Sequence, residues 1–332
     1  MVKSDVGGEK EGVILKSQQD KLRELGIREF KEPIHLQDKE WLVERFGPGM
    51  KYPVNVSLLI RNIVWQARCW IMEGKIPPIN GLVRNFWYSH IKIALSRSDS
   101  FNSSVDQCEQ FTKQLVIMVR YNDLMRYKEM GFIDNNQNSQ KVGINNHVIL
   151  FAEKVGHFPL LERIASDTEV TIVSLGGQPS VLSAEYFVDR MKEEGIDVRK
   201  SFYLFSLVDY DTSGWIIKDA FVWDLRFYGI KHVAVEDLIL PKIFSDEEIE
   251  LYKYRLPESS QMKKKNRKWM ARTGGINNQF YGLQADSAPT QRLENLFKEK
   301  TKELIGSTEP IRRARAEIEL SEAIDKFILS KV

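Results

Sequence analysis

Three short apolar runs, separated by segments of helical character, constrain the fold of this 332-residue chain more than any other feature. The runs cover residues 148–151, 170–175 and 202–208. Apolar residues at helical spacing follow them at residues 159–165, 182–195 and 213–228. Because short buried strands that alternate with helices form parallel sheets, this half of the chain is predicted to be an α/β domain. Residues 233–240 could add another strand.

A different sequence feature follows the carboxyl end of each run. Glu153 follows the first run, a glycine turn at residues 176–179 ends the second, and Asp209 and Asp211 follow the third. The carboxyl ends of parallel strands meet at one edge of the sheet, where open α/β sheets bind their ligands. Alternate residues of a strand point the same way, so Asp209 and Asp211 are expected to face one site.

Three carboxylates at one edge of a sheet predict a cation between them. Without one they would repel each other strongly. Oxygen ligands suit a hard cation such as Mg²⁺, which a few carboxylates hold while water and phosphate complete the shell. Glu153, Asp209 and Asp211 are therefore the predicted Mg²⁺ ligands. The alternative is that the Asp-x-Asp pattern only caps the following helix.

The half of the chain before this domain has a different pattern. Helical spacing of apolar residues extends over residues 54–73, 79–95 and 105–121, and a short polar stretch at 124–146 is typical of a hairpin or loop. Three helices followed by a small β element predict a winged helix. The fold class is thus a multidomain combination of α+β and α/β. The predicted divisions are a charged N-terminal arm (1–40), a winged-helix domain (41–145) and an α/β domain with a C-terminal extension (146–332).

Charge is unevenly distributed although the net charge is only +2. Residues 41–145 hold 13 basic and 8 acidic side chains, residues 146–261 hold 12 and 20, and residues 262–332 hold 15 and 9. An acidic middle between basic flanks fits a metal site beside surfaces that contact a polyanion, and ordinary variation of surface charge explains the counts equally well. The basic stretch at residues 263–272 fits either a solvated helix face or a phosphate contact.

Several classes of protein find no support in the sequence. No run approaches the ~18 apolar residues of a membrane span, and residues 1–21 lack the apolar core of a signal peptide. Cys69 and Cys108 are expected to be buried free thiols, which fits a reducing cytoplasm. Neither a zinc-binding Cys/His spacing nor a Gly-Lys-Ser/Thr phosphate loop occurs, so ATP hydrolysis would need another chain. A closing amphipathic helix is expected at residues 309–328.

A tyrosine in the second helical segment is a candidate nucleophile. Tyr88 follows Arg84 by four residues, which places both side chains on one face of a helix. A phenol with a pKa near ~10 is a poor nucleophile at neutral pH unless a base or a cation assists it. Arg84 could stabilise the phenolate or the charge that builds on a phosphate. The alternative is that residues 86–88 (Phe-Trp-Tyr) are core aromatics and Arg84 only reaches from the helix to solvent.

These residues resemble a known family. Residues 152–156 with Glu153, the turn at 176–179 and residues 209–214 look like a Toprim domain, a Rossmann-like α/β fold. Residues 84–88 (Arg-Asn-Phe-Trp-Tyr) are similar to the catalytic-tyrosine motif of the topoisomerase VI A subunit and its meiotic double-strand-break relatives. That motif reads Arg, Asp, aliphatic, Tyr, Tyr, and Tyr88 falls on its nucleophile. Residues 281–289 resemble a signature near the family's C-terminus, so the resemblance covers residues 54–297.

The chain departs from the family pattern at four positions. Asn85 replaces an Asp, Trp87 replaces the first tyrosine, Thr212 replaces a proline, and Ser180 stands where Asp is frequent. The chain is also short for such a subunit. It is therefore similar to the small, divergent A-subunit homologues of plasmids and mobile elements.

The resemblance implies a type IIB, topoisomerase VI-like activity. Tyr88 would attack double-stranded DNA to give a 5′-phosphotyrosyl end, with Mg²⁺ in the Toprim site and Glu153 as a ligand or a general acid. It also implies a homodimer, in which the tyrosine of one protomer meets the metal site of the other, and a separate GHKL-type ATPase B subunit. Two alternatives remain: a metal-dependent Toprim nuclease or primase-like enzyme in which Tyr88 is structural, and a non-catalytic DNA-binding module.

Overall fold

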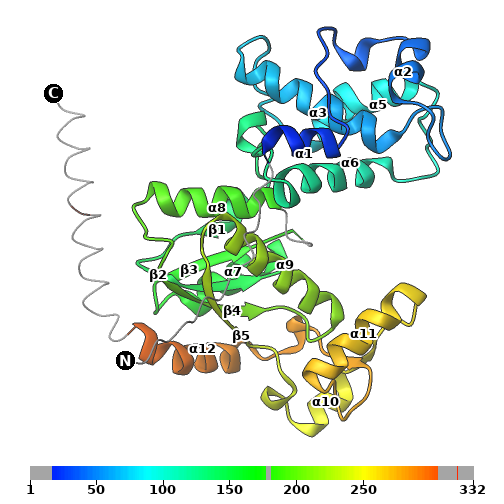
Figure 1. The fold of residues 1–332 in the computed structure, drawn as a ribbon. Coiled ribbons are helices and arrows are strands. Elements are labelled where there is room, and N and C mark those ends of the chain that lie inside the picture. Colours follow the sequence, from blue (N-terminus) through cyan, green and yellow to red (C-terminus); the bar gives the residue numbers. More distant parts are fainter. Residues whose placement is uncertain (1–16, 177–180, 306–319, 321–332) are drawn as a thin grey trace, which may run out of the picture. The chain divides into compact units, whose positions relative to one another are not determined.

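The computed structural model describes residues 17–176, 181–305 and 320, and the chain divides into two compact units, Met1–Ile133 and Asp134–Val332. Figure 1 draws the elements of both units. Three parts of the predictions lie outside the described residues: positions 177–179 of the turn predicted at 176–179, Ser180, and all but one residue of the helix expected at 309–328. No helix in the described part of the chain is both long and apolar enough to cross a membrane.

Unit 1 is helical over its described residues. Its α-helices are α1 (Gln18–Glu24), α2 (Lys39–Phe46), α3 (Val56–Met72), α4 (Val83–Phe86), α5 (Lys92–Arg97) and α6 (Gln107–Val116). Its shorter 3₁₀ and π segments are η1 (Ile34–Leu36), η2 (Trp87–Ile91), η3 (Ile117–Tyr121) and η4 (Lys128–Met130). The three predicted helical segments are confirmed, and a π-helical segment interrupts the second of them and ends the third.

Helix α3 is the centre of unit 1. Its side chains Leu59, Ile60 and Ile63 are buried, and each contributes about 2 kcal/mol by leaving water. The buried amides of Asn62 and Gln66 hold the preceding chain by hydrogen bonds to the backbone between residues 26 and 34. The end of the segment predicted as a separate arm is therefore packed into unit 1, because α3 supplies its backbone with partners.

The small β element expected at residues 124–146 does not form a wing in unit 1. The described residues of this unit hold only an isolated bridge between Gly81 and Phe132. Strand β1 (Gln140–Lys141) instead pairs antiparallel with β3 (Val170–Ser174) of unit 2. The cause is a buried polar network, since the Asp134 carboxylate accepts hydrogen bonds from Ser183 (2.7 Å) and from Gln140 (3.3 Å). The boundary at Ile133 thus precedes the predicted one.

Unit 2 contains the expected sheet, which has parallel strands except at one edge. Its five strands are β1, β2 (Asn145–Ala152), β3 (Val170–Ser174), β4 (Ser201–Leu207) and β5 (His232–Asp237), in the order β1-β3-β2-β4-β5. The crossover helices are α7 (Phe158–Ala165), α8 (Val181–Glu193) and α9 (Thr212–Tyr228). The predicted strands and helices are confirmed, and residues 233–240 do add a strand.

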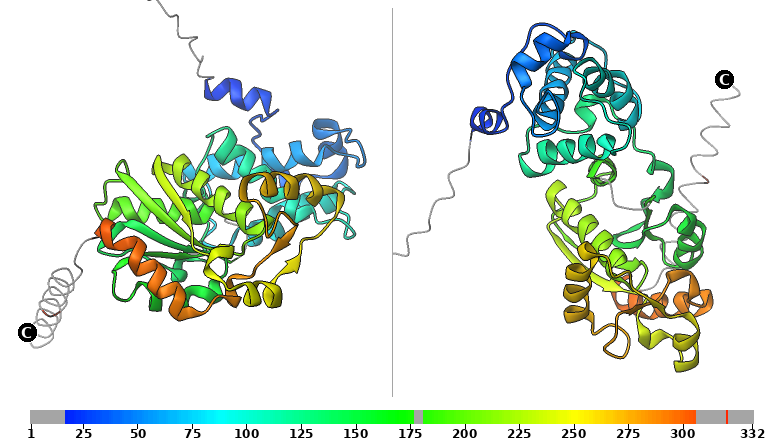
Figure 2. Two further views of the ribbon diagram at one scale, coloured as in Figure 1. Left: turned by 90° about the horizontal axis from the view of Figure 1, so that it is seen from below. Right: turned by 90° about the vertical axis from the view of Figure 1, so that its right-hand side faces the viewer.

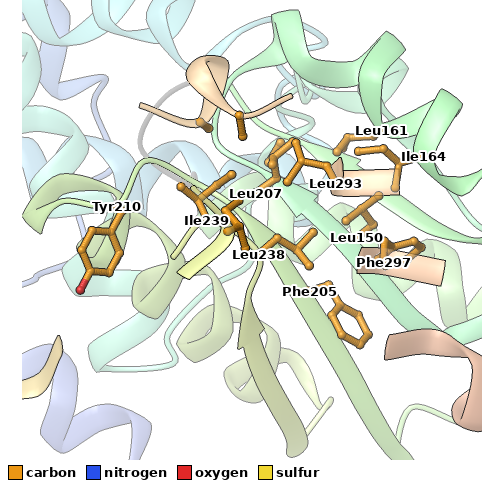
Figure 3. Packing of buried hydrophobic residues seen from close by; sticks show 14 of the residues in the cluster. Leu150, Leu161, Ile164, Phe205, Leu207, Tyr210, Leu238, Ile239, Leu293 and Phe297 are labelled. Atoms are coloured by element: carbon orange, nitrogen blue, oxygen red, sulfur yellow. The ribbon is translucent and has the colours of Figure 1, made fainter. Parts of the chain in front are cut away.

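Helices cover both faces of the sheet. Leu150 faces the cluster formed with α7 and with α12 (Thr290–Ile305), as Figure 3 shows. Its neighbour Phe151 points the other way and stacks on Phe221 of α9, with ring centroids 4.6 Å apart. Helix α12, orange in Figure 1 and in the left view of Figure 2, lies against the first of these faces. Burial on both faces explains why the strands are continuous apolar runs.

The C-terminal extension of unit 2 adds a small second layer of structure beside α9. It comprises α10 (Asp246–Tyr252), β6 (Tyr254–Arg255), α11 (Ser260–Thr273) and β7 (Tyr281–Gly282), and β6 pairs with β7. Trp269 of α11 is fully buried and packs edge-on against Tyr210. Lys263, Lys264 and Lys265 of the same helix are exposed, which fits both a solvated helix face and a phosphate contact.

Cys69 and Cys108 are free thiols. Both are half-buried rather than buried as predicted. The partial burial raises the pKa of both thiols.

Candidate active site

The predicted acids lie at the point where the strand order reverses. From β2 the chain crosses to β3 on one side, and from β3 it crosses back to β4 on the other side of β2. The carboxyl ends of β2 and β4 are therefore neighbours, at the position where open α/β sheets bind ligands. Glu153 directly follows β2, and Asp209 follows β4 after one residue. The topology thus brings these carboxylates to one edge of unit 2.

Glu153 is the least satisfied member of this group. Its side chain is buried, and Oε2 has no hydrogen-bond partner among the described residues. Burial raises the pKa of Glu153 to about 7, and the negative charge of Asp209 adds to the effect. An unpaired buried carboxylate is costly, and a cation between Glu153 and Asp209 would remove that cost.

Asp209 and Asp211 have different partners. Asp209 Oδ1 accepts a hydrogen bond from the backbone N–H of Ala285 at 2.7 Å. Asp211 caps helix α9, since its Oδ1 accepts from the N–H of Gly214 at 2.7 Å, and its Oδ2 accepts from the Tyr254 hydroxyl at 2.6 Å. The capping interpretation is thus confirmed for Asp211, whereas Asp209 contributes no cap.

Three side chains that the sequence analysis did not single out surround the acids. Lys154 Nζ lies 3.4 Å from both carboxylate oxygens of Asp209 and 3.0 Å from Asp286 Oδ2. The buried His157 ring contacts the other oxygen of Asp286 at 2.7 Å. The hydrogen bonds from His157 and Lys154 hold the pKa of Asp286 below its usual range. Asp286 lies in the segment 281–289, and the family resemblance of that segment was the sequence signal that could have identified it.

The acids fit a hard cation chemically, although they do not form a closed ligand cage. In the part of the chain that the structure describes, no three His, Cys, Asp or Glu side chains are arranged to hold a metal ion. The charge of Asp209 is instead balanced by Lys154. Mg²⁺ needs only one or two carboxylates because it keeps several waters. Glu153, with its unpartnered oxygen, and Asp209 are the side chains that would hold it directly, and Asp211 lies next to them.

Tyr88 lies in unit 1, in the π-helical segment η2 between α4 and α5. Phe86 and Trp87 are buried in the core, as the alternative interpretation proposed for all three aromatics, but the Tyr88 side chain is 49% exposed. Single π turns inside α-helices are frequent at functional sites. The structure therefore separates Tyr88 from its two aromatic neighbours and presents it to solvent.

Two cations flank the Tyr88 ring. The Arg84 guanidinium lies 5.8 Å from the ring centroid, and a hydrogen bond with Tyr88 raises the pKa of Arg84. Lys92 Nζ lies 5.4 Å from the same ring and 4.9 Å from that of Phe101. Lys92 was not singled out from the sequence, although its spacing of four residues from Tyr88 mirrors that of Arg84. Positive charge on both sides of the ring favours a bound phosphate.

His90 has a structural role beside Tyr88. Its ring stacks on Phe86 at 4.3 Å and lies 4.4 Å from the ring of His35. Burial, helped by the nearby His35, lowers the pKa of His90 to about 4. The imidazole is therefore neutral at physiological pH and packed between aromatic rings, which suits a core residue.

Neither protein-family models nor the curated proteins give a match to this chain. The fold and the site therefore define its class on their own. It is a mixed α/β protein with a parallel-rich sheet, which carries carboxylates at the switch point of that sheet and an exposed tyrosine between two cations in a separate helical unit.

Proposed function

We propose that this protein is a DNA double-strand-cleaving transesterase that resembles the topoisomerase VI A subunit. The observation that carries the proposal is the presence of both halves of such a site in one chain. Unit 2 has the unpaired Glu153 beside Asp209 at a sheet switch point, and unit 1 presents Tyr88 between Arg84 and Lys92.

In the proposed reaction the Tyr88 oxygen attacks a DNA phosphorus and loses its proton. A phosphorus–oxygen bond to tyrosine forms while the bond to the 3′ oxygen breaks, and that oxygen leaves as a hydroxyl after taking up a proton. Arg84 and Lys92 stabilise the negative charge of the attacking phenol and of the phosphate. The Mg²⁺ that Glu153 and Asp209 would hold supplies polarisation of the phosphate. The phosphotyrosyl ester conserves the bond energy, so resealing is the reverse reaction.

The family resemblance supplies the assembly in this proposal. It places the Tyr88 of one protomer at the acids of a second protomer, so that a homodimer cuts both strands of a duplex. Two Toprim domains and two tyrosines are needed for two cuts. ATP-driven strand passage would require a separate GHKL-type ATPase chain, since this sequence has no phosphate-binding loop motif.

The direct test is a denaturing gel for protein attached covalently to plasmid DNA. The wild-type chain is expected to form an adduct with Mg²⁺ and none with chelator. Tyr88→Phe should abolish the adduct. Tyr121→Phe is the matched control, because Tyr121 is also exposed in a π-helical segment of unit 1 and has the Arg120 guanidinium 5.7 Å from its ring. An adduct that survives Tyr88→Phe would refute the proposed nucleophile.

A Toprim nuclease without a covalent intermediate is the second candidate. It is favoured by the fact that Glu153, Asp209, Lys154 and Asp286 all belong to unit 2 and need nothing from unit 1. If this function is correct, the Tyr88→Phe variant cleaves DNA and the Asp209→Asn variant does not. If the protein instead only binds DNA, neither the wild-type chain nor the variants cut it. Both substitutions should then leave DNA binding unchanged.

A further inference from the structure

A pocket of about 290 Å³ opens beside Asp209 and Asp211 in unit 2. Helices α9 and α11 form two of its walls, through Trp215 and Lys218 on the first and Arg272 on the second. The reaction proposed above uses none of these three side chains. Their chemistry therefore indicates a second binding site next to the candidate metal site.

Arg272 and the aromatic ring of Trp215 together form a flat wall of the pocket. The Arg272 guanidinium lies 5.4 Å from the centre of the Trp215 ring, in a cation–π arrangement. Trp215 Nε1 has no hydrogen-bond partner among the described residues, so no hydrogen bond fixes the indole in its present position. Aromatic rings and guanidinium planes are the surfaces on which proteins stack nucleobases.

The charges around the pocket disfavour a phosphate as its ligand. Lys218 is buried, and its ammonium lies 2.7 Å from both carboxylate oxygens of Asp237, so its charge is neutralised. Arg272 is paired with Asp219 at 3.3 Å. Asp209 and Asp211 add two further carboxylates to the lining. A planar, uncharged ligand that both donates and accepts hydrogen bonds fits this lining, with Asp237 and Lys218 as polar partners.

We propose that this pocket binds a nucleobase, stacked on Trp215. The base belongs either to a free nucleotide or to an unpaired nucleotide of the DNA substrate. The second source rests on the proposed function, and it would place a base extruded from the duplex next to the phosphate at the metal site. Removal of the stacking partner should weaken base binding about tenfold or more.

The first experiment uses the full chain with Tyr88→Phe, in chelator, so that neither cleavage nor metal contributes. Binding of deoxyadenosine monophosphate and of deoxyribose 5-phosphate is measured by equilibrium dialysis. A duplex with one unpaired adenine and the same duplex with an abasic residue at that position are compared in parallel. Preference for the base in the first pair identifies a nucleotide site, and preference only in the second pair identifies a DNA-base site.

Variants connect the preference to the pocket. Trp215→Ala should remove the preference for the base, whereas Trp223→Ala, an exposed tryptophan further along α9, should keep it. Equal binding of the base-containing and baseless ligands in both pairs would overturn the proposal, as would a base preference that survives Trp215→Ala. A covalent adduct in the wild-type chain without any base preference would refute the pocket alone. Base preference without an adduct would refute only the proposed function.

Discussion

At the candidate metal site, the free-energy cost of burying unpaired negative charge falls mainly on one side chain, Glu153. It is buried, one of its oxygens has no partner in the described chain, and Asp209 is the charged neighbour that raises its pKa most. The physical origin of its raised pKa is the same as the origin of cation affinity. Both follow from negative charge that is kept away from water.

The first prediction concerns the pH dependence of stability. The pKa of Glu153 rises from 4.5 to about 7 on folding, so the folded chain binds a proton more tightly than the unfolded one. This contribution is complete below pH 4.5 and is lost as the pH rises through about 7. In chelator we expect the Tm to fall by several degrees over that window. Glu153→Gln should flatten this part of the profile in a thermal scan, and an unchanged profile would contradict the assignment.

The second prediction concerns Lys154. Its ammonium lies against Asp209 and Asp286, where a metal ion would also bind. Lys154→Met should raise Mg²⁺ affinity about tenfold, because one positive charge leaves the site, and should lower the Tm in chelator. Isothermal titration calorimetry measures the affinity. Lys200→Met, at an exposed position of the same unit, is the control and should change neither quantity. Weaker binding of Mg²⁺ by Lys154→Met would show that Lys154 supports the ion rather than competing with it.

At the scale of elements, the strands were the most predictable part of the fold. Runs of apolar residues buried on both faces of a sheet have no competing interpretation once helices alternate with them. The wing predicted from residues 124–146 does not form in unit 1, because Asp134, Ser139 and Gln140 of this polar stretch belong to unit 2. They are buried, and Asp134 bonds to a helix some fifty positions later in the chain. Pairing over such a separation leaves no local signal in the sequence.

The same limit applies to the candidate site. Glu153, Asp209 and Asp211 could be predicted because each follows a strand that the sequence reveals. Lys154 and Tyr254 could not, because their roles depend on contacts made after the sheet has formed, and Asp286 was indicated only by the resemblance of residues 281–289. The exposure of Tyr88 was likewise hidden. Tyr88 lies in a π-helical segment and is exposed, whereas its neighbours Phe86 and Trp87 are buried.

The third prediction concerns helix α3. Asn62→Ala removes the side chain that accepts from the Arg28 N–H and donates to the Gly26 carbonyl. Two backbone groups lose their partner, so unit 1 should be destabilised by about 2 kcal/mol or more. Urea denaturation followed by tryptophan fluorescence measures the loss, since α3 carries Trp65 and Trp70. A loss well below 1 kcal/mol would show that water replaces the amide at little cost.

At the scale of the whole molecule, the tyrosine and the acids belong to different units. The proposed function requires that they act together. The resemblance implies that they do so between protomers. This arrangement can be tested without any knowledge of how the two units are oriented.

The fourth prediction is therefore a complementation experiment. Tyr88→Phe and Asp209→Asn protomers are each expected to be inactive. When they are mixed, a dimer with sites shared between protomers has one site with both residues intact and one with neither. Such a mixture should nick plasmid DNA on one strand and restore adducts. An arrangement within one protomer would leave the mixture inactive. Unmixed variants and a mixture of Tyr88→Phe with wild type serve as controls.

The ammonium of Lys154 has a further consequence at the scale of the cell. Because Lys154 already neutralises Asp209, a divalent ion that binds there has to displace its ammonium group, and we expect binding to need a higher ion concentration. Occupancy of the site then depends on how much Mg²⁺ is free and on whether a DNA phosphate arrives to share the ion. Within the proposed function, Lys154 sets a threshold below which the protein binds a chromosome without breaking it.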